Sequence, residues 1–181
     1  MLNLSLDVCN DYSKTSKILD VGCATGETLK LLEQNNFTNI YGVDNSKSMI
    51  KHYTGSAKIL LSENFPVDTG TFDVILMNWT LHFIKDKIKY LTDVFTGLNN
   101  NGVFVLTDKT SLDPYSIKFY HQYKRSKGVS EQAIRQKELD IKDIMYIDSV
   151  EWYLENLKKI GFTQVNIANA SWCFTSFVCQ K

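Results

Sequence analysis

The sequence predicts an α/β fold in which a doubly wound, mostly parallel sheet of seven strands ends in an antiparallel C-terminal hairpin. Short apolar runs alternate with helical patterns over the first half of the chain. These runs are almost continuously apolar, which is typical of strands that are buried on both faces. Near the C-terminus, two further runs are joined by a tight turn. We therefore expect helices on both faces and a ligand at the carboxyl ends of the strands.

Length and composition predict a single folded domain spanning residues 1–181. The chain has 20 basic and 20 acidic residues, is 44% hydrophobic, and contains only 9 glycines and 2 prolines. This composition is typical of a globular protein rather than of a disordered segment. Zero formal charge argues against a strongly basic nucleic-acid binder.

The first half of the chain predicts the parallel strands. A glycine turn at 22–26 follows the first strand, and a helix with Leu29 and Leu32 on one side comes next. The polar run 44–46 can cap a second helix, which extends through Ile50. The expected parallel strands are the apolar runs 17–21, 40–43, 58–61, 72–77 and 103–107.

The second half of the chain departs from this alternation. Helical spacing of apolar residues predicts a helix over 84–98, which Asn99 to Gly102 would end. The polar and aromatic segment 113–146 is helix-prone, and we interpret it as an insertion or lid. An amphipathic helix is expected over 149–160, ending at Gly161. The two hairpin strands are expected at 163–170 and 172–179.

Cysteine and histidine usage predicts neither disulfides nor a metal site. The cysteines are scattered, without a Cys-x-x-Cys pair, and the histidines lie far apart in the sequence. No stretch approaches the roughly 20 apolar residues of a membrane span. We expect four free thiols and a cytoplasmic protein that does not contact membranes.

The glycine turn carries the strongest functional signal. Its sequence is Asp20-Val-Gly-Cys-Ala-Thr-Gly26, at the end of the first strand. Glycines permit close approach of the backbone to a ligand, and the following helix presents free amide groups. Asp44 ends the second strand, where a carboxylate can accept hydrogen bonds from both ribose hydroxyls. A turn without a ligand is the alternative for the heptapeptide alone.

A dinucleotide site is the competing interpretation, because it shares the strand, the turn and the ribose carboxylate. Residues 23–25 are Cys, Ala and Thr, so the second glycine needed for approach to a pyrophosphate is missing. Asp20 adds a carboxylate beside the turn, which suits a cationic ligand better than a pyrophosphate.

This D-x-G-x-x-x-G arrangement resembles motif I of the class I S-adenosylmethionine-dependent methyltransferases, which have a Rossmann-like fold. The resemblance extends from Ile18 to the C-terminus. It implies that the loop cradles the methionine moiety of S-adenosyl-L-methionine, that Asp44 binds the ribose, and that Glu63 and Asn64 meet the adenine. The cofactor-binding residues implied are Asp20, Gly22, Cys23, Ala24, Gly26, Asp44, Asn45, Glu63, Asn64 and Asn78.

Within this superfamily, the chain is most similar to the carboxy-S-adenosylmethionine synthases that support wobble-uridine modification in tRNA. Matching segments include 44–46, 78–83, 123–125, 136–137 and 148–149. Two features differ from that family. Glu138 stands where the family has an arginine that holds the extra carboxylate, and Arg135 lies about one helical turn before it. The segment before Lys17 is shorter, which would leave the cofactor more exposed, and Tyr12 is too close to the first strand to match the family's cofactor-covering tyrosine.

The sulfonium of S-adenosylmethionine already supplies an activated methyl group, so a strong catalytic base is not required. His82 is a weak candidate proton acceptor, and a packed or surface histidine is the alternative. Candidate walls of an acceptor pocket are Trp79, Phe83, Tyr115, Phe119 and Tyr120, and the basic residues of the insertion are Lys118, Lys124, Arg125 and Lys127.

These features favour a methyltransferase acting on an unidentified acceptor, either a small molecule or a substrate of the tRNA pathway. A synthase of the carboxylated cofactor that uses prephenate is the second interpretation, and a cofactor-binding relic is the third. We expect the insertion 113–146 to act as a lid or as the contact of a homodimer, because its aromatic residues are costly to leave in water.

Overall fold

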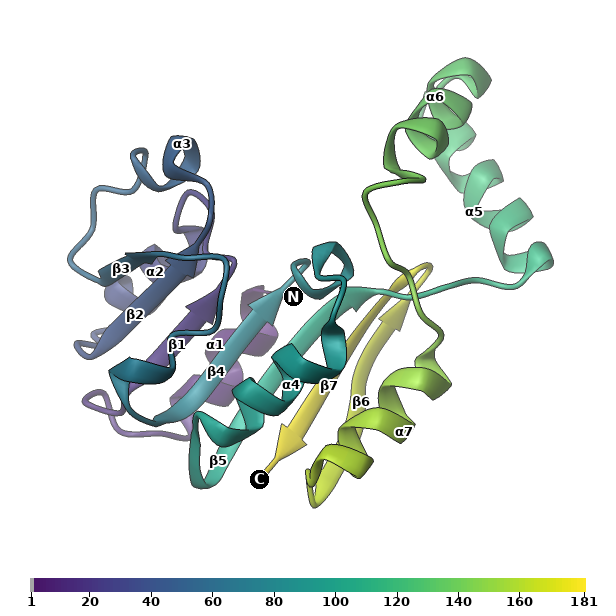
Figure 1. Cartoon of the computed structure of the whole chain (residues 1–181). Helices are drawn as coiled ribbons and strands as arrows, with labels where there is room; N and C mark the ends of the chain where they lie inside the picture. The colour runs from purple at the N-terminus through teal and green to yellow at the C-terminus, as the bar shows by residue number, and fades with distance from the viewer. Residues whose placement is uncertain (1) are drawn as a thin grey trace.

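The computed structural model describes residues 2–181 and has one seven-stranded sheet in the order β3-β2-β1-β4-β5-β7-β6 (Figure 1). The strands are β1 Ile18–Val21, β2 Ile40–Asp44, β3 Lys58–Leu61, β4 Phe72–Asn78, β5 Leu98–Lys109, β6 Gln164–Ser171 and β7 Phe174–Gln180. Strands β1 to β5 pair in parallel, and β7 pairs antiparallel with both β5 and β6. The predicted mixed sheet with an antiparallel hairpin is therefore confirmed.

Helices cover both faces of the sheet, and each face has its own apolar core. The α-helices are α1 Leu2–Asn10, α2 Glu27–Gln34, α3 Lys47–Ile50, α4 Lys87–Thr96, α5 Pro114–Ser126, α6 Glu131–Ile141 and α7 Val150–Ile160. Two 3-10 helices, η1 Val67–Thr69 and η2 Leu81–Phe83, complete the chain. Figure 1 shows α4 and α7 on one face and α1 and α2 on the other. Leu91 and Leu157 belong to the first core, and Leu29 and Leu32 to the second.

The boundary between α4 and β5 differs from the prediction. The helix covers Lys87–Thr96 rather than 84–98. Asp86 caps its N-terminus, because the Asp86 side chain accepts a hydrogen bond from the Lys89 amide at 3.1 Å. β5 already begins at Leu98, which pairs with Phe72. The segment expected to be a loop, 99–102, is therefore part of the strand, and the Asn99 side-chain amide donates to Asp73 at 2.7 Å.

The segment before β1 forms the helix α1, which the sequence analysis did not predict. Ser5 and Cys9 of this helix are buried, and Cys9 joins the core that α2 shares. Asn78 at the end of β4 donates to the Ser5 hydroxyl at 3.3 Å. α1 therefore reaches the carboxyl end of the central strand, where the ligand is expected.

The predicted insertion 113–146 is a pair of helices, α5 and α6, that projects beyond the carboxyl ends of the strands (Figure 1). Asp113 and Ser130 cap the two helices. The turn between β6 and β7 anchors the projection, because the ring of Trp172 lies 5.1 Å from that of Tyr123 and 5.5 Å from that of Tyr120.

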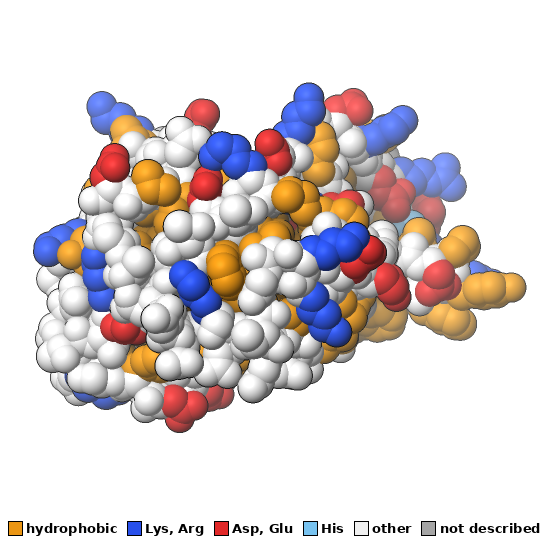
Figure 2. Space-filling model, turned by 60° about the horizontal axis from the view of Figure 1, so that its bottom comes forward, with side chains coloured by type: hydrophobic (Ala, Val, Ile, Leu, Met, Phe, Trp, Pro, Cys, Tyr) orange, Lys and Arg blue, Asp and Glu red, His pale blue; other side chains and the backbone are white. Residues whose placement is uncertain are grey.

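All four cysteines are free and buried. Over the described residues, no helix has both the length and the hydrophobicity needed to cross a bilayer. Acidic and basic side chains are interspersed on the face shown in Figure 2, in agreement with the zero formal charge.

Candidate active site

The glycine turn folds tightly against the end of β2. The amides of Gly22 and Cys23 both donate to the Val43 carbonyl, at 2.8 and 3.2 Å. Gly26 then donates to the Cys23 carbonyl at 2.8 Å, and its own carbonyl accepts from Lys30 as α2 begins. Gly22 and Gly26 have φ values of 73° and 80°, and Ala24 has 47°. The turn thus needs the left-handed conformation at three alternate positions.

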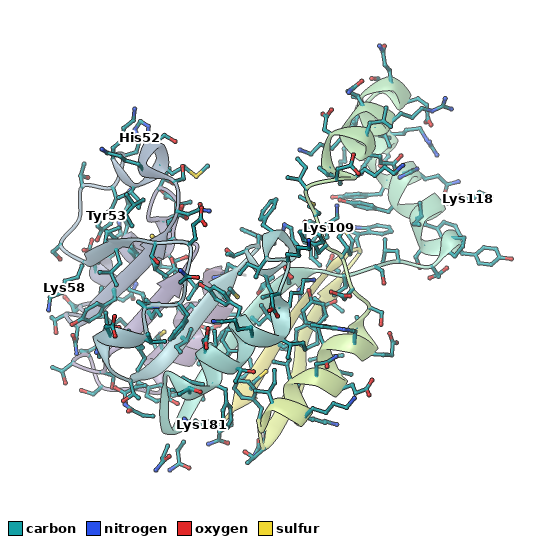
Figure 3. All side chains as sticks on the ribbon, viewed as in Figure 1. His52, Tyr53, Lys58, Lys109, Lys118 and Lys181 are labelled. Carbon is teal, nitrogen blue, oxygen red and sulfur yellow. The ribbon has the colours of Figure 1, made fainter. Side chains whose placement is uncertain are left out.

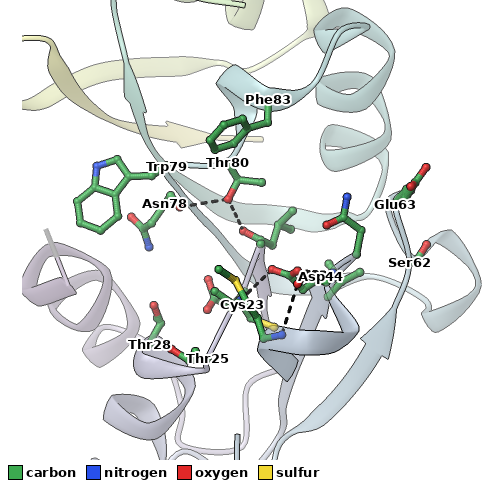
Figure 4. Close-up of a pocket in the computed structure, with 18 of the residues that line it drawn as sticks. Cys23, Thr25, Thr28, Asp44, Ser62, Glu63, Asn78, Trp79, Thr80 and Phe83 are labelled. Atoms are coloured by element: carbon green, nitrogen blue, oxygen red, sulfur yellow. Dashed lines mark hydrogen bonds between the residues drawn. The ribbon is translucent and has the colours of Figure 1, made fainter. Parts of the chain in front are cut away.

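Asp44 connects this turn to β2 through both of its carboxylate oxygens. Oδ2 accepts from the Ala24 amide at 2.9 Å, and Oδ1 accepts from the Ser46 amide at 2.8 Å. Each oxygen has two lone pairs, so the carboxylate still has acceptor capacity for ligand hydroxyl groups. Figure 4 shows Asp44 beside Cys23 at the centre of the site.

The structure gives a packing reason for both glycines. A Cβ atom added to Gly22 would overlap the Thr80 side chain, and one added to Gly26 would overlap the Tyr53 ring. Thr80 is held in place by donating to the Asn78 and Val21 carbonyls, at 3.1 and 3.3 Å. Close packing of protein side chains against the turn, as well as room for a ligand, therefore requires glycine.

A cavity of about 760 Å³ opens beside this turn, at the carboxyl ends of β1, β2 and β4 (Figure 4). Eight of the predicted cofactor residues line it: Asp20, Gly22, Cys23, Ala24, Asp44, Asn45, Glu63 and Asn78. Gly26 is buried behind the turn, and Asn64 is exposed beside the lining residue Ser62. The Ser62 hydroxyl donates to the Asn64 carbonyl and accepts from its amide, both at 3.0 Å. Gly26 and Asn64 thus support the cavity wall without lining it.

The cavity contains an unusual buried carboxyl group. Burial raises the pKa of Asp20 to about 7; a hydrogen bond with Thr28 opposes this shift and the neighbouring Asp44 adds to it. Burial likewise raises the pKa of the Cys23 thiol to about 12, with further contributions from Asp20 and Asp44. Cys23 is therefore a neutral packing group at neutral pH, and the two carboxyl groups create a site suited to a cation.

Asn78 supplies a second indication that this cavity is a ligand site. Among the described residues, its Oδ1 is the one buried side-chain oxygen or nitrogen without a hydrogen-bond partner. Its Nδ2 is engaged by Ser5, so Oδ1 is left as an acceptor in the cavity wall. A buried acceptor without a partner costs free energy, and a ligand N–H or O–H group would satisfy it.

A second cavity of about 920 Å³ lies between the sheet and the α5/α6 pair. Trp79 and Phe83 line both cavities, so the two share a wall. Of the predicted acceptor-pocket aromatics, Tyr120 also lines the second cavity, whereas Tyr115 and Phe119 do not and are 77% and 54% exposed. They point to solvent because α5 projects away from the sheet.

The basic residues of the insertion are also divided. Lys124 lines the second cavity together with Lys109, Lys137 and Lys142, whereas Lys118, Arg125 and Lys127 do not. Figure 3 places Lys109 where the sheet meets the projecting helices and Lys118 on α5. Burial lowers the pKa of the Lys109 ammonium, and the nearby cations Lys124 and Lys137 act in the same direction.

Glu138 lines this second cavity, and Arg135 does not. The Glu138 carboxylate pairs with His121 Nε2 at 2.8 Å, which links α6 to α5. Arg135 instead faces Glu131, with its Nε 3.4 Å from the carboxylate. Arg135 therefore points to Glu131 and does not bring its positive charge to the place of the Glu138 side chain.

Sequence reasoning missed several residues of the first cavity. Thr80, Ser62 and Met49 all contribute to its wall, but none was among the predicted cofactor-binding residues. Thr80 has a detectable signal, since it lies two residues after Asn78, the polar end of β4, within the segment 78–83 that matches the synthase family. Over residues 2–181, no group of three or more His, Cys, Asp or Glu side chains is arranged to hold a metal ion.

Comparison with known proteins identifies the class. A family model described as a methyltransferase domain matches residues 8–163. The chain therefore belongs to the methyltransferase domain family.

Within this family, the chain is similar to relatives named carboxy-S-adenosyl-L-methionine synthase. Carboxy-S-adenosyl-L-methionine synthase from Shewanella sediminis is 31% identical, over 100% of this chain and 83% of the relative. The synthase of the same name from Actinobacillus pleuropneumoniae serotype 5b is 29% identical, over 92% of this chain and 77% of the relative. The resemblance to these synthases is thereby confirmed.

Solved structures support the fold. The plantazolicin methyltransferase BpumL, in complex with a triazolic desmethylPZN analog and SAH, aligns with a TM-score of 0.74 at 16% identity, covering 99% of this chain and 82% of that one. A SAM-dependent methyltransferase from Archaeoglobus fulgidus aligns with a TM-score of 0.69 at 13% identity, covering 100% and 95%.

Proposed function

We propose that this protein is an S-adenosylmethionine-dependent methyltransferase that acts on an acceptor held in the second cavity. The observation that carries the proposal is the first cavity, where Asp20 and Asp44 face the glycine turn and Asn78 offers an unpaired acceptor. Membership of the methyltransferase domain family supports the same cofactor.

The lining residues fit the parts of S-adenosylmethionine. Asp20 and Asn78 would accept hydrogen bonds from the amino group of the methionine moiety beside the glycine turn. Asp44 would accept from the ribose hydroxyls with its remaining lone pairs. Glu63 and Asn45 also line the cavity and would meet the adenosine, with Asn64 holding Ser62 in place.

When bound, S-adenosylmethionine supplies a methyl group activated by its sulfonium. The protein's task is then to bind, orient and exclude water. Trp79 and Phe83 stand between the two cavities, so an acceptor in the second cavity meets the cofactor at this shared wall. The positive φ of Trp79, 55°, orients the indole at the end of β4.

Native mass spectrometry of the freshly purified protein tests the cofactor first, because a retained ligand identifies itself by mass. Titration calorimetry with S-adenosylmethionine, S-adenosylhomocysteine and NAD then measures the preference. We expect the two sulfur compounds to bind and NAD not to bind. Tight NAD binding would overturn the assignment of S-adenosylmethionine as the cofactor. Cofactor binding without turnover on any acceptor would favour the third interpretation, a cofactor-binding relic without catalytic activity.

The second candidate function is synthesis of carboxy-S-adenosylmethionine from prephenate. The names of relatives at about 30% identity favour it. Glu138 opposes it, because this residue lines the second cavity, and by the sequence resemblance it stands where that family has an arginine. The cofactor by-product separates the two candidates, since a methyltransferase releases S-adenosylhomocysteine with a methyl acceptor and without prephenate.

We also propose a cytoplasmic homodimer formed through the α5/α6 pair, with a small molecule or a component of the tRNA pathway as substrate. The helices project from the sheet and expose apolar side chains that would be costly in water: Tyr115, Ile117, Phe119, Tyr123, Val129 and Leu139. A second copy of the same surface would cover them.

A further inference from the structure

His82 and Asp108 form a buried pair outside the first cavity. His82 belongs to η2 and is 3% exposed, and Asp108 belongs to β5 and is fully buried. His82 Nδ1 is hydrogen-bonded to Asp108 Oδ1. An ionised carboxylate can only accept, so a neutral ring that makes this bond carries its proton on Nδ1 and has a free lone pair on Nε2.

The carboxylate of Asp108 is itself held in position by a chain of donors. Its Oδ2 accepts from the Tyr153 hydroxyl at 2.6 Å. Burial, and then Asp108, raise the pKa of Tyr153, so this phenol remains a donor. Lys87 lies 3.4 Å from the Tyr153 hydroxyl and donates to Asp148 at 2.5 Å and to the Tyr146 carbonyl. Four elements of the fold thus fix the orientation of one imidazole ring.

The free nitrogen of this ring is directed to the acceptor side. His82 lines the second cavity, next to Phe83, which belongs to both cavities. Over the described residues, His82 Nε2 has no protein hydrogen-bond partner, and it is not among the fully buried unpaired atoms. Nε2 is therefore accessible to a molecule in the second cavity.

Three charged groups belong to this network. Asp108 is fully buried, the Lys87 side chain is 4% exposed and the Asp148 side chain is 32% exposed. A proton transferred to Nε2 would give an imidazolium that lies directly against the buried Asp108 carboxylate, and opposite charges attract strongly where water is excluded.

We propose that His82 is a catalytic residue that takes a proton at Nε2 from the O–H or N–H group of a methyl acceptor in the second cavity. Asp108 and Tyr153 are positioning residues that hold the reactive tautomer. The acceptor's lone pair forms the new bond to the methyl carbon, the carbon–sulfur bond breaks with its electron pair on sulfur, and the acceptor's proton passes to Nε2 and then to solvent. This proposal rests on the proposed methyltransferase function.

The first test needs no acceptor. The protein is treated with diethylpyrocarbonate, with and without added S-adenosylmethionine. The reagent reacts with unprotonated imidazole nitrogen, and peptide mass spectrometry follows the modification of each histidine. His52 and His121 serve as internal references. We expect His82 to react, and to react at least tenfold more slowly in Asp108→Asn, because an amide can donate to Nδ1 and leave the proton on Nε2. An unreactive His82, or one whose rate Asp108→Asn leaves unchanged, overturns the proposal.

The second test measures turnover with S-adenosylmethionine and three acceptor probes, 4-hydroxybenzoate, catechol and dopamine. For any probe that releases S-adenosylhomocysteine, His82→Gln should lower kcat by about 10²- to 10⁴-fold with little change in KM. Asp108→Glu should retain more activity than Asp108→Asn. Equal kcat in His82→Gln overturns the proposal, and where no probe turns over, the modification rates decide alone.

Calorimetry with S-adenosylmethionine tests cofactor binding separately from the role of His82. Unchanged cofactor affinity in His82→Gln shows that a loss of turnover does not come from the first cavity. Absence of cofactor binding in the unmutated protein would refute the proposed function instead, and would leave the modification result to judge the His82–Asp108 pair.

Discussion

The Asp44 carboxylate accepts a hydrogen bond from the Ala24 amide at 2.9 Å, so the end of β2 and the glycine turn of β1 are one structural unit. The left-handed conformation of Ala24, with φ of 47°, directs its amide at this carboxylate. One side chain thereby shapes the turn and also offers acceptors to a ligand.

Asp44→Ala should weaken S-adenosylmethionine binding about 10- to 150-fold. The expected loss is about 1.5–3 kcal/mol, the typical contribution of a hydrogen bond to a charged group. Titration calorimetry measures it, with the exposed Asp11→Ala as the matched control. Unchanged affinity in Asp44→Ala would reject the ribose assignment.

Asp20 should make the ligand-free protein less stable as pH rises. The folded state holds this proton up to about pH 7, whereas the unfolded chain releases it near the ordinary value of 3.8. Between these values the unfolded state binds fewer protons, so the free energy of unfolding falls with increasing pH and levels off above about 7. The full difference is about 4 kcal/mol.

Urea unfolding of the wild type and Asp20→Asn at pH 5, 6, 7 and 8 isolates this contribution. The variant's stability advantage should grow from pH 5 to 8, because its amide does not ionise. Binding of the cationic cofactor should release a proton near pH 6.5, detectable as a calorimetric enthalpy that depends on the buffer. A stability difference independent of pH would contradict the raised pKa of Asp20.

Gly22→Ala should destabilise the protein more than Gly128→Ala. Both glycines have positive φ, 73° and 84°, so alanine brings similar backbone strain of about 1–2 kcal/mol at each. Only at Gly22 does the new methyl group overlap Thr80, whereas no atom lies within 4 Å at Gly128. Thermal unfolding of both variants measures the difference. Equal destabilisation would show that the Thr80 side chain moves away from the new methyl group without loss of stability.

Glu138 should prevent efficient formation of carboxy-S-adenosylmethionine. A carboxylated cofactor would bring a negative charge towards this side chain, and two unit charges 4 Å apart repel by about 4 kcal/mol at an effective dielectric of 20. With prephenate and S-adenosylmethionine, we expect mass spectrometry to find the product only in Glu138→Arg. The exposed Glu151→Arg is the control for added charge. Efficient product formation by the unmutated chain would refute this expectation.

The α5/α6 pair should hold two copies of the chain together. Tyr115 and Phe119 are 77% and 54% exposed, and serine at both positions removes apolar surface without disturbing the core. Light scattering should report a dimer for the unmutated protein and a monomer for the double variant. The exposed Met49→Ser, on α3, is the control, and a monomeric unmutated protein would disprove the contact.

The sheet could be predicted because its signals are local. Each parallel strand is a short apolar run, and the glycine turn and Asp44 follow β1 and β2 directly in the sequence. The start of β5 could not, because Leu98 extends the strand only through pairing with Phe72 on another element. The helix α1 also lacked a strong pattern, and its burial depends on contact with α2.

The same distinction applies to the site. Residues with a role in the family motifs were identified, whereas Thr80 and Ser62 stand beside predicted residues in the sequence and only the folded chain shows that they line the first cavity. His82 was a candidate on its own, but its partners could not be inferred. Asp108 and Tyr153 lie 26 and 71 positions away in sequence, and only the folded chain brings them to the ring.

The place of β7 in the sheet has a consequence for the nascent chain. β5 finds its second neighbour only about 70 residues later, as in the bond between Thr107 and Ser176 at 2.9 Å. Until β7 leaves the ribosome, the long edge of β5 has unpaired amide and carbonyl groups, which can recruit strands from other chains. Fragments that stop before Phe174 should therefore aggregate during synthesis, although they contain every residue that lines the first cavity.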